Sequence, residues 1–237
     1  MELKNYQIQV ISDLERFLEL LIEKQSISSA YSTLWNEKGV NVGIDGMPPY
    51  KMELAGVPQV CFKVPTGGGK TFLAANSIKP IFDSMPHIHP KAVVWLVPSD
   101  AILTQTYRTL TDKNHDYRKK IDVDFGNKVE IYSKQQLLNG QNFNPTSVSD
   151  NLSVFVLSYD SFRTSKKDER KAYQENGSLL PFVRFKQDSG SLLEDTDETA
   201  LIQVIRKLNP VVIVDDERVI IRTKLEKPSK IKGLALI

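Results

Sequence analysis

The segment of residues 64–71, Val-Pro-Thr-Gly-Gly-Gly-Lys-Thr, constrains the fold of this chain more than any other. Residues 59–64 have the composition of a buried strand, and residues 71–78 begin a helical pattern. A glycine-rich turn between a strand and a helix bends the backbone around an anion, beside the partial positive charge of the helix end. A turn without a ligand rarely ends in Gly-Lys-Thr in this context, so the pattern predicts a site for a nucleoside triphosphate.

Each residue type in this segment has a predicted task. Lys70 reaches the β- and γ-phosphates, and the hydroxyl of Thr71 is a ligand for Mg²⁺. The residues that we expect to bind the phosphates are Thr66, Gly67, Gly68, Gly69, Lys70 and Thr71.

Strands and helices alternate along the chain. Continuous apolar runs of the kind found in doubly covered parallel strands occupy 92–97, 153–158 and 211–215, with a shorter β-type run at 128–132. Apolar residues at helical spacing predict helices at 6–23, over Ile102 to Leu110 after a cap at Ser99 or Asp100, and at 201–208. This alternation predicts a parallel α/β sheet.

Other stretches have weaker patterns. Residues 26–58 lose periodicity and are expected to form a long surface excursion, and residues 164–194 an exposed polar insertion or mobile lobe. Asp195 with Glu198 resembles a helix-capping signal. Cys61, the single cysteine, is interpreted as a small buried hydrophobe.

Composition restricts the function classes. Lys+Arg 31 against Asp+Glu 29 leaves a net charge of +2, which argues neither for nor against a nucleic-acid partner. The basic runs at 118–120 and 163–171 are expected to be solvated faces and carry only a weak expectation of phosphate contacts. Without a disulfide framework, an apolar signal region or a membrane-spanning run, we expect a cytoplasmic protein with no membrane partner.

The apolar run at 211–215 ends in Asp215. A carboxylate at the carboxyl end of a parallel strand near the phosphate loop is placed to hold Mg²⁺ through water. A strand that merely ends in a solvated aspartate is common. Together with the glycine-rich segment, however, the position favours a metal ligand.

At this point the chain resembles a known family. The order of its elements is similar to the first RecA-like domain of a superfamily-two helicase, closest to the ATPase (Res) subunit of type III restriction enzymes and related DEAD/DEAH-type proteins. The segments that carry the resemblance are Tyr6-Gln7 (the upstream glutamine), 64–71 (motif I), 95–100 with Gln105 (motif Ia), 157–162 (the motif Ib region) and 211–215 (the start of motif II).

The resemblance implies one RecA-like P-loop NTPase domain over residues 1–217, with a mainly parallel sheet covered by helices on both faces, and an atypical basic tail at 218–237. It implies ATP and Mg²⁺ as cofactors, and double-stranded DNA and a methyltransferase (modification) subunit as partners. Gln7 would read adenine, although it could also be an exposed polar residue at a helix start. The implied nucleic-acid contacts are Pro98, Ser99, Gln105, Ser158 and Tyr159.

The chain departs from the family pattern after Asp215. The family has Glu, a small residue and His there, whereas this chain has Asp216, Glu217 and Arg218. The catalytic candidates are therefore Lys70 and either Asp216 or Glu217. The side chain of Asp216 is one methylene shorter than the glutamate of the family, and Glu217 lies one position later in the chain than that glutamate. A displacement of about 1 Å can cost on the order of 10²-fold in rate.

No second RecA-like domain fits before residue 237, which favours a truncated or frame-shifted product that hydrolyses ATP weakly or not at all. Sequencing of the gene tests the frame shift, since an intact frame excludes it. Two alternatives stay open: a non-catalytic nucleotide-binding remnant, and a helicase-like protein that acts on RNA. An ATP-turnover assay with DNA or RNA separates them.

Overall fold

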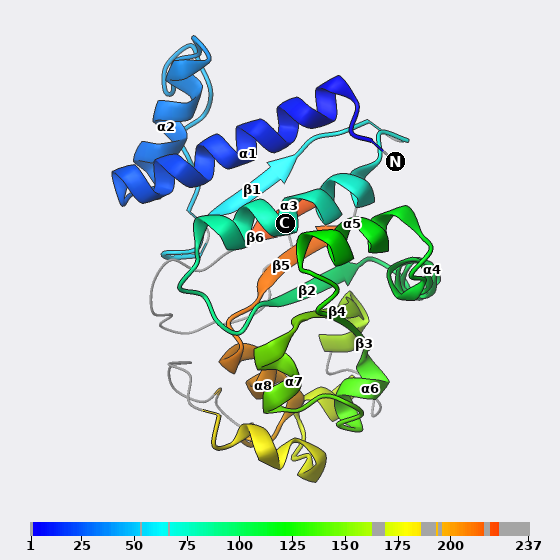
Figure 1. Ribbon diagram of the computed structural model, residues 1–237. Coiled ribbons are helices and arrows are strands. Elements are labelled where there is room, and N and C mark those ends of the chain that lie inside the picture. Colours follow the sequence, from blue (N-terminus) through cyan, green and yellow to red (C-terminus); the bar gives the residue numbers. More distant parts are fainter. Residues whose placement is uncertain are drawn as a thin grey trace.

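A six-stranded sheet forms the centre of the chain (Figure 1). The computed structural model describes residues 2–52, 54–65, 67–162, 169–185, 193, 196–215 and 219–222, with the backbone alone for 169–170 and 219–222. The strands are β1 (Gln59–Phe62), β2 (Ala92–Val97), β3 (Val129–Ser133), β4 (Leu152–Ser158), β5 (Val211–Asp215) and β6 (Val219–Arg222). Their order across the sheet is β1-β6-β5-β2-β4-β3.

The sheet is mainly parallel, as the alternation of strands and helices predicts. β5, β2, β4 and β3 form a continuous parallel ladder, while β6 pairs antiparallel with both β5 and β1. β1 therefore points in the same direction as β5. The carboxyl ends of the five strands that share this direction (β1, β5, β2, β4 and β3) therefore lie along one edge of the sheet. The glycine-rich segment begins at this edge, directly after β1. β6 falls within residues 218–237, where we expected only a basic tail.

Helices cover both faces of the sheet. One face carries α1 (Asn5–Lys24), α2 (Ile27–Glu37), α3 (Lys70–Ser84), α4 (Asp100–Thr111) and α5 (Asp116–Asp124). The other carries α6 (Lys134–Leu138), α7 (Pro145–Asp150), α8 (Leu201–Lys207) and the 3-10 turns η2 (Glu169–Tyr173) and η3 (Gly177–Phe182), with η1 (Tyr159–Phe162) directly after β4. The α/β architecture with two covered faces is thus confirmed.

Alternation along the strands divides the core into two clusters. In β2, Val93, Trp95 and Val97 face the layer of α1 and α3, while Val94 and Leu96 face the layer of α8. Successive side chains of a strand point to opposite faces, so a fully buried strand needs apolar residues at every position. All six residues of β2 are buried.

The helix predictions at 6–23 and around 102–110 are confirmed by α1 and α4, and Ser99 caps α4 by accepting a hydrogen bond from the amide of Ile102 at 3.4 Å. Within residues 26–58, α2 was missed. It is short, it begins at the cap Ser26, and it buries only Ile27 and Ala30, so its apolar pattern is weak.

Two further expectations need correction. The middle of the segment at 164–194 is packed, because Ala172, Leu179 and Phe182 are buried in the cluster under α8; residues 163–168 and 186–192 lie outside the described part. The apolar stripe predicted at 201–208 is buried in α8, but the helix starts at Leu201 after the cap position Ala200, so the capping signal of Asp195 with Glu198 does not mark its start. Asp195 itself lies outside the described residues.

Cys61 is exposed, contrary to its interpretation as a buried hydrophobe. Phe62 and Val60 face the cluster under α1 and α3, so Cys61 points to the opposite face. The described residues of the cluster on that face include none from β1, which forms the edge of the sheet. Because helices cover only one face of this edge strand, the side chains that point to its other face are accessible to solvent.

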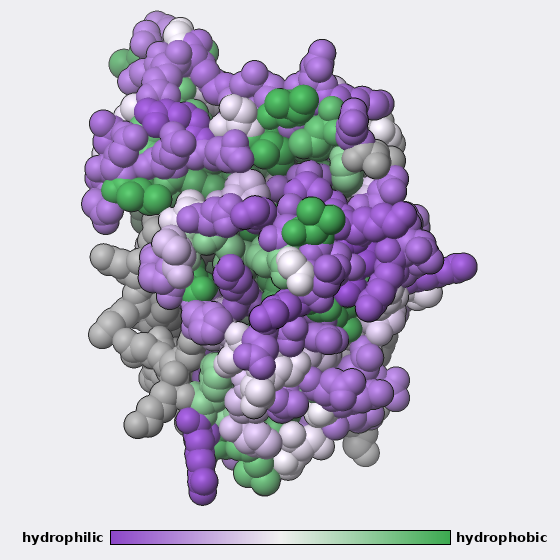
Figure 2. All heavy atoms as spheres, viewed as in Figure 1, coloured by the Kyte–Doolittle hydropathy of each residue, from purple (hydrophilic) through white to green (hydrophobic). Residues whose placement is uncertain are grey.

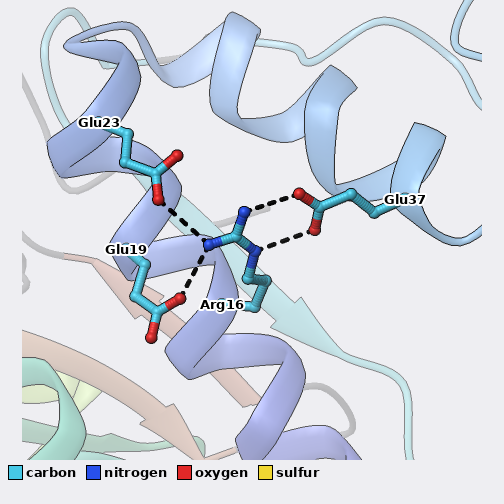
Figure 3. Close-up of polar contacts among 4 residues, drawn as sticks. All are labelled: Arg16, Glu19, Glu23 and Glu37. Carbon is cyan, nitrogen blue, oxygen red and sulfur yellow. Dashed lines mark hydrogen bonds and ion pairs between the residues drawn. The ribbon is translucent and has the colours of Figure 1, made fainter.

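α2 is attached to α1 through charged side chains at the surface. Arg16 of α1 donates to Glu37 of α2 from both Nε and Nη2, at 2.9 and 2.7 Å, and its Nη1 bonds Glu19 and Glu23 (Figure 3). Lys38, next to Glu37, pairs with Asp13 of α1 at 2.6 Å. These pairs join the excursion between the first helix and β1 to the body of the domain.

Hydrophilic side chains cover most of the face shown in Figure 2, with hydrophobic atoms along α1 and in smaller areas below it. Ile8 and Ile22 of α1 are about half exposed, and Val123 of α5 is 79% exposed. Exposed apolar residues of this kind are ordinary for a protein surface. Within the described ranges, no helix combines the length and apolar character that a membrane span requires.

Candidate functional site

The glycine-rich segment connects β1 to α3 at the carboxyl edge of the sheet. A Cβ at Gly68 would lie 2.5 Å from Val64 Cγ1 and 2.8 Å from the Pro65 carbonyl oxygen, so no other residue fits there without displacement. Gly69 has φ +73°, in the left-handed region, and a Cβ on it would lie 2.7 Å from Gln7 Nε2. Packing against α1, as well as backbone conformation, therefore requires glycine in this turn.

Side chains of the first helical turn of α1 donate hydrogen bonds to the glycine-rich segment. The hydroxyl of Tyr6 donates to the carbonyl oxygen of Gly68 at 2.7 Å, and Gln7 Nε2 donates to the same oxygen at 3.0 Å. Gln7 Oε1 accepts from the amide of Lys4 at 2.9 Å. Gln7 is only 4% exposed, so the alternative of an exposed residue at a helix start is wrong. Its predicted contact with adenine stays a prediction.

Lys70 and Thr71 form the amino end of α3, directly after Gly69. Both are partly exposed. Within the part of the chain that the structure describes, their side chains have no hydrogen-bond or ion-pair partner, and their backbone amides have no acceptor. A free ammonium, a free hydroxyl and unpaired amides at a helix amino end are the groups that an anion such as phosphate requires. Thr66 lies outside the described residues.

Asp215 ends β5 and is 8% exposed. Its Oδ2 accepts a hydrogen bond from the indole Nε1 of Trp95, on the neighbouring strand β2, at 3.2 Å. Because residues 213 and 215 share a face, Asp215 points to the same layer as Ile213, which packs in the cluster of α3. α3 also contacts β5 directly.

Aromatic rings of α3 and α5 stack on one another beside the start of α3. Phe72 follows Thr71 and is buried, and its ring stacks on Tyr117 with centroids 5.4 Å apart. Burial, and after it the negative charges of Asp215 and Asp116, raise the pKa of Tyr117 above its ordinary value. Tyr117 therefore lies within electrostatic reach of Asp215. Sequence reasoning missed both Trp95 and Tyr117, because they are 120 and 98 positions away from Asp215 along the chain.

The residue types at the start of α3 and the end of β5 fit a magnesium ion. Mg²⁺ prefers oxygen ligands, keeps several waters, and is usually bound by one or two protein groups together with the phosphates of a substrate. A threonine hydroxyl at the amino end of α3 and a carboxylate at the end of β5 supply such oxygens. Asp216 and Glu217, the candidates for positioning water, lie outside the described residues.

Four predicted nucleic-acid contacts lie at the carboxyl ends of β2 and β4, whereas Gln105 lies on α4. Val97 of β2 pairs with Ser158 of β4, so the segments that follow these two strands are neighbours. Ser99 and Gln105 are exposed, and Pro98 is half-buried. Ser158 is buried, and its hydroxyl lies 3.4 Å from that of Ser161, so it shapes the turn after β4. Tyr159 is half-buried.

The basic run at 118–120 does not form a solvated face throughout. Arg118 is buried, and its guanidinium donates to Asp122 and to the carbonyl oxygens of Leu110 and Val129. Lys120 pairs with Asp124. The weak expectation of phosphate contacts from Arg118 is therefore wrong, because its donors join α5 to α4 and β3. Residues 163–168 of the second run lie outside the described part.

One of three comparisons with known proteins finds a match. A comparison with models of protein families matches residues 1–218 to the family described as type III restriction enzyme, res subunit. No curated protein and no solved structure matches the chain significantly.

Proposed function

The chain belongs to the family of type III restriction enzyme res subunits, and from this premise we propose that it binds Mg-ATP and acts as the motor domain of a DNA-dependent translocase. The family supports an ATPase of the helicase type. The observation that carries the proposal is that Lys70 and Thr71 have no side-chain partner among the residues that the structure describes. They lie at the amino end of a helix that packs on β5, whose last residue is the buried Asp215.

In this proposal each group has one task. The Lys70 ammonium and the amides of Gly69, Lys70 and Thr71 bind the phosphates. The Thr71 hydroxyl and the Asp215 carboxylate hold Mg²⁺, directly or through water. The metal, when bound, neutralises charge on the phosphates of ATP.

Gln7 is proposed to connect the adenine to the phosphate loop. Its carboxamide has two donors and two acceptor positions, and the bonds to Gly68 and Lys4 use one of each. One donor and one acceptor remain, which is the combination that the edge of adenine requires.

We propose that double-stranded DNA crosses the edge formed by the neighbouring segments after β2 and β4, with contacts from Ser99 and Tyr159 at this edge and from Gln105 on α4. Contacts of this kind position a phosphate backbone and carry no base sequence. A modification methyltransferase is the proposed protein partner, on the ground of family membership. We further propose that hydrolysis is slow, because Asp216 is one methylene shorter than the glutamate expected to position water.

A steady-state phosphate-release assay on the chain tests the proposed activity. It is run without nucleic acid, with duplex DNA and with RNA of equal length, and Lys70→Ala measures the background. We expect slow Mg²⁺-dependent release that DNA stimulates more than RNA. Stimulation by RNA alone contradicts the proposed partner. Turnover near 1 s⁻¹ or above, within the common enzyme range, contradicts the proposed slow hydrolysis.

A further inference from the structure

Trp95 and Asp215 meet across two neighbouring strands. Trp95 is in register with Ile213, so Asp215 lies two residues further along β5 and on the same face. The indole Nε1 reaches Asp215 Oδ2 at 3.2 Å, and the ring is fully buried. The contact therefore lies inside the protein, beside the carboxyl edge where α3 begins.

The donor is held more rigidly than most side chains could be. β2 pairs with β5 on one side and β4 on the other, and every one of its residues is buried. An indole has a single donor and no acceptor, so its hydrogen bond has one direction. A hydrogen bond to an ionised group is stronger than one between neutral groups, and a low-dielectric interior strengthens it further. The bond consequently restrains rotation of the Asp215 carboxylate.

From this geometry we propose that Trp95 is a positioning residue of the magnesium site, whose indole N–H orients the Asp215 carboxylate before the metal binds. The inference rests on the proposed function, in which Asp215 holds Mg²⁺. An ionised carboxylate offers about four lone-pair positions, and Trp95 occupies one of them. Mg²⁺ demands near-ideal octahedral geometry, so a ligand that is already oriented binds it better than one that must be ordered first.

The surrounding residues agree with such a role. Phe72, the residue after Thr71, is buried against Tyr117, which in turn lies within electrostatic reach of Asp215. The Asp215 carboxylate is thus bonded to a buried indole, and the residue after Thr71 is a buried aromatic side chain. Groups that orient metal ligands through hydrogen bonds typically contribute 10- to 100-fold in metal affinity.

The main experiment separates metal binding from nucleotide binding. Trp95→Phe keeps the aromatic bulk and removes the donor, while Trp35→Phe, on α2, is the matched control. Titration of a fluorescent ATP analogue is done in EDTA and again with increasing Mn²⁺. We expect Trp95→Phe to bind the nucleotide in EDTA as the wild type does, but to require roughly 10- to 100-fold more Mn²⁺. Equal Mn²⁺ requirement in the two proteins overturns the proposal.

A second measurement does not depend on the folding of Trp95→Phe. In the Trp35→Phe protein, Trp95 is the single tryptophan of the chain. Paramagnetic Mn²⁺ added with nucleotide is expected to quench its emission, because the metal would lie next to the hydrogen-bonded carboxylate. Asp215→Asn in the same background is expected to remove the quenching. Bound Mn²⁺-nucleotide without quenching of Trp95 overturns the proposal.

Failure of the proposed function gives a different result. If the wild type binds no nucleotide with or without metal, the ATP site itself is wrong, and the inference about Trp95 falls with it. If the wild type binds Mn²⁺-nucleotide and Trp95→Phe responds identically, the ATP site stands and only the positioning role is contradicted.

Discussion

Two arginines of this protein make similar sets of bonds in opposite surroundings. Arg16 contacts three glutamates at the surface, with its side chain 36% exposed. Arg118 contacts one aspartate and two carbonyl oxygens, with its side chain 8% exposed. Arg16 has more ionic partners, yet water competes for each of them, whereas no solvent replaces the partners of Arg118. Burial, and not the number of ion pairs, should decide which arginine stabilises the fold.

The largest expected effect follows replacement of Arg118. Arg118→Ala leaves Asp122 buried without its charged partner and two carbonyl oxygens without a donor, so we expect a loss of about 3–5 kcal/mol in the free energy of unfolding. Urea denaturation followed by circular dichroism measures it. Lys119→Ala, at the exposed neighbouring position, is the matched control and should stay within about 0.5 kcal/mol. Equal urea midpoints for the two variants contradict the comparison.

A similar contrast exists at the phosphate loop, where buried Gln7 and partly exposed Tyr6 donate to the same oxygen of Gly68. We expect Gln7→Ala to reduce the preference for ATP over GTP by roughly tenfold, since one or two hydrogen bonds of about 1 kcal/mol each are lost. Tyr6→Phe removes a bond to the loop but none to the base, so the preference should remain. Competition titrations with both nucleotides measure it, and an unchanged preference in Gln7→Ala means that Gln7 only holds the loop.

Replacement of Arg16 should have a much smaller effect than replacement of Arg118. The glutamates that Arg16→Ala leaves behind are solvated, so we expect a shift in the urea midpoint near the resolution of the measurement. Because the Debye length falls to about 3 Å in 1 M salt, that shift should disappear in concentrated NaCl. A salt-independent loss as large as that of Arg118→Ala would show that α2 depends on this cluster for its position.

The smallest effect concerns pH. Hydrogen bonds from the Arg16 guanidinium lower the pKa of Glu37 below its ordinary value of 4.5. The folded pKa is therefore the lower one, so the pair contributes fully above the pKa of the unfolded state and loses its contribution as pH falls through the folded value. Carboxyl NMR titration should show the pKa of Glu37 rising towards 4.5 in Arg16→Gln. An unchanged pKa would show that the bonds drawn in Figure 3 do not persist in solution.

The strands and main helices could be predicted because their signals are local. The run from Ala92 to Val97 is apolar at every position, which buried parallel strands require, and Leu201, Val204 and Ile205 follow the period of a helix. The glycine-rich segment was equally clear, since the spacing of its residue types is the one typical of phosphate-binding loops.

The features that could not be predicted depend on distant neighbours. Arg118 lies in a charged run that resembles a solvated face, but its partners Leu110 and Val129 are brought to it by the packing of α4 and β3. Cys61 is exposed because the covered face of an edge strand cannot be inferred from the strand alone. The contact between Trp95 and Asp215 joins residues from two strands with no pattern linking them.

The most direct test of the central claim, that Lys70 binds the phosphates of ATP, is a titration of fluorescent ATP analogue with Mg²⁺ into three proteins. Lys79, on the same helix as Lys70, pairs with Asp83 at the surface and supplies the matched control. We expect the wild type and Lys79→Ala to bind alike. Lys70→Ala should bind at least about 10²-fold more weakly with an unchanged urea midpoint, because it loses charged hydrogen bonds to phosphate and no core packing. Equal affinity in all three proteins would contradict the assignment of the site.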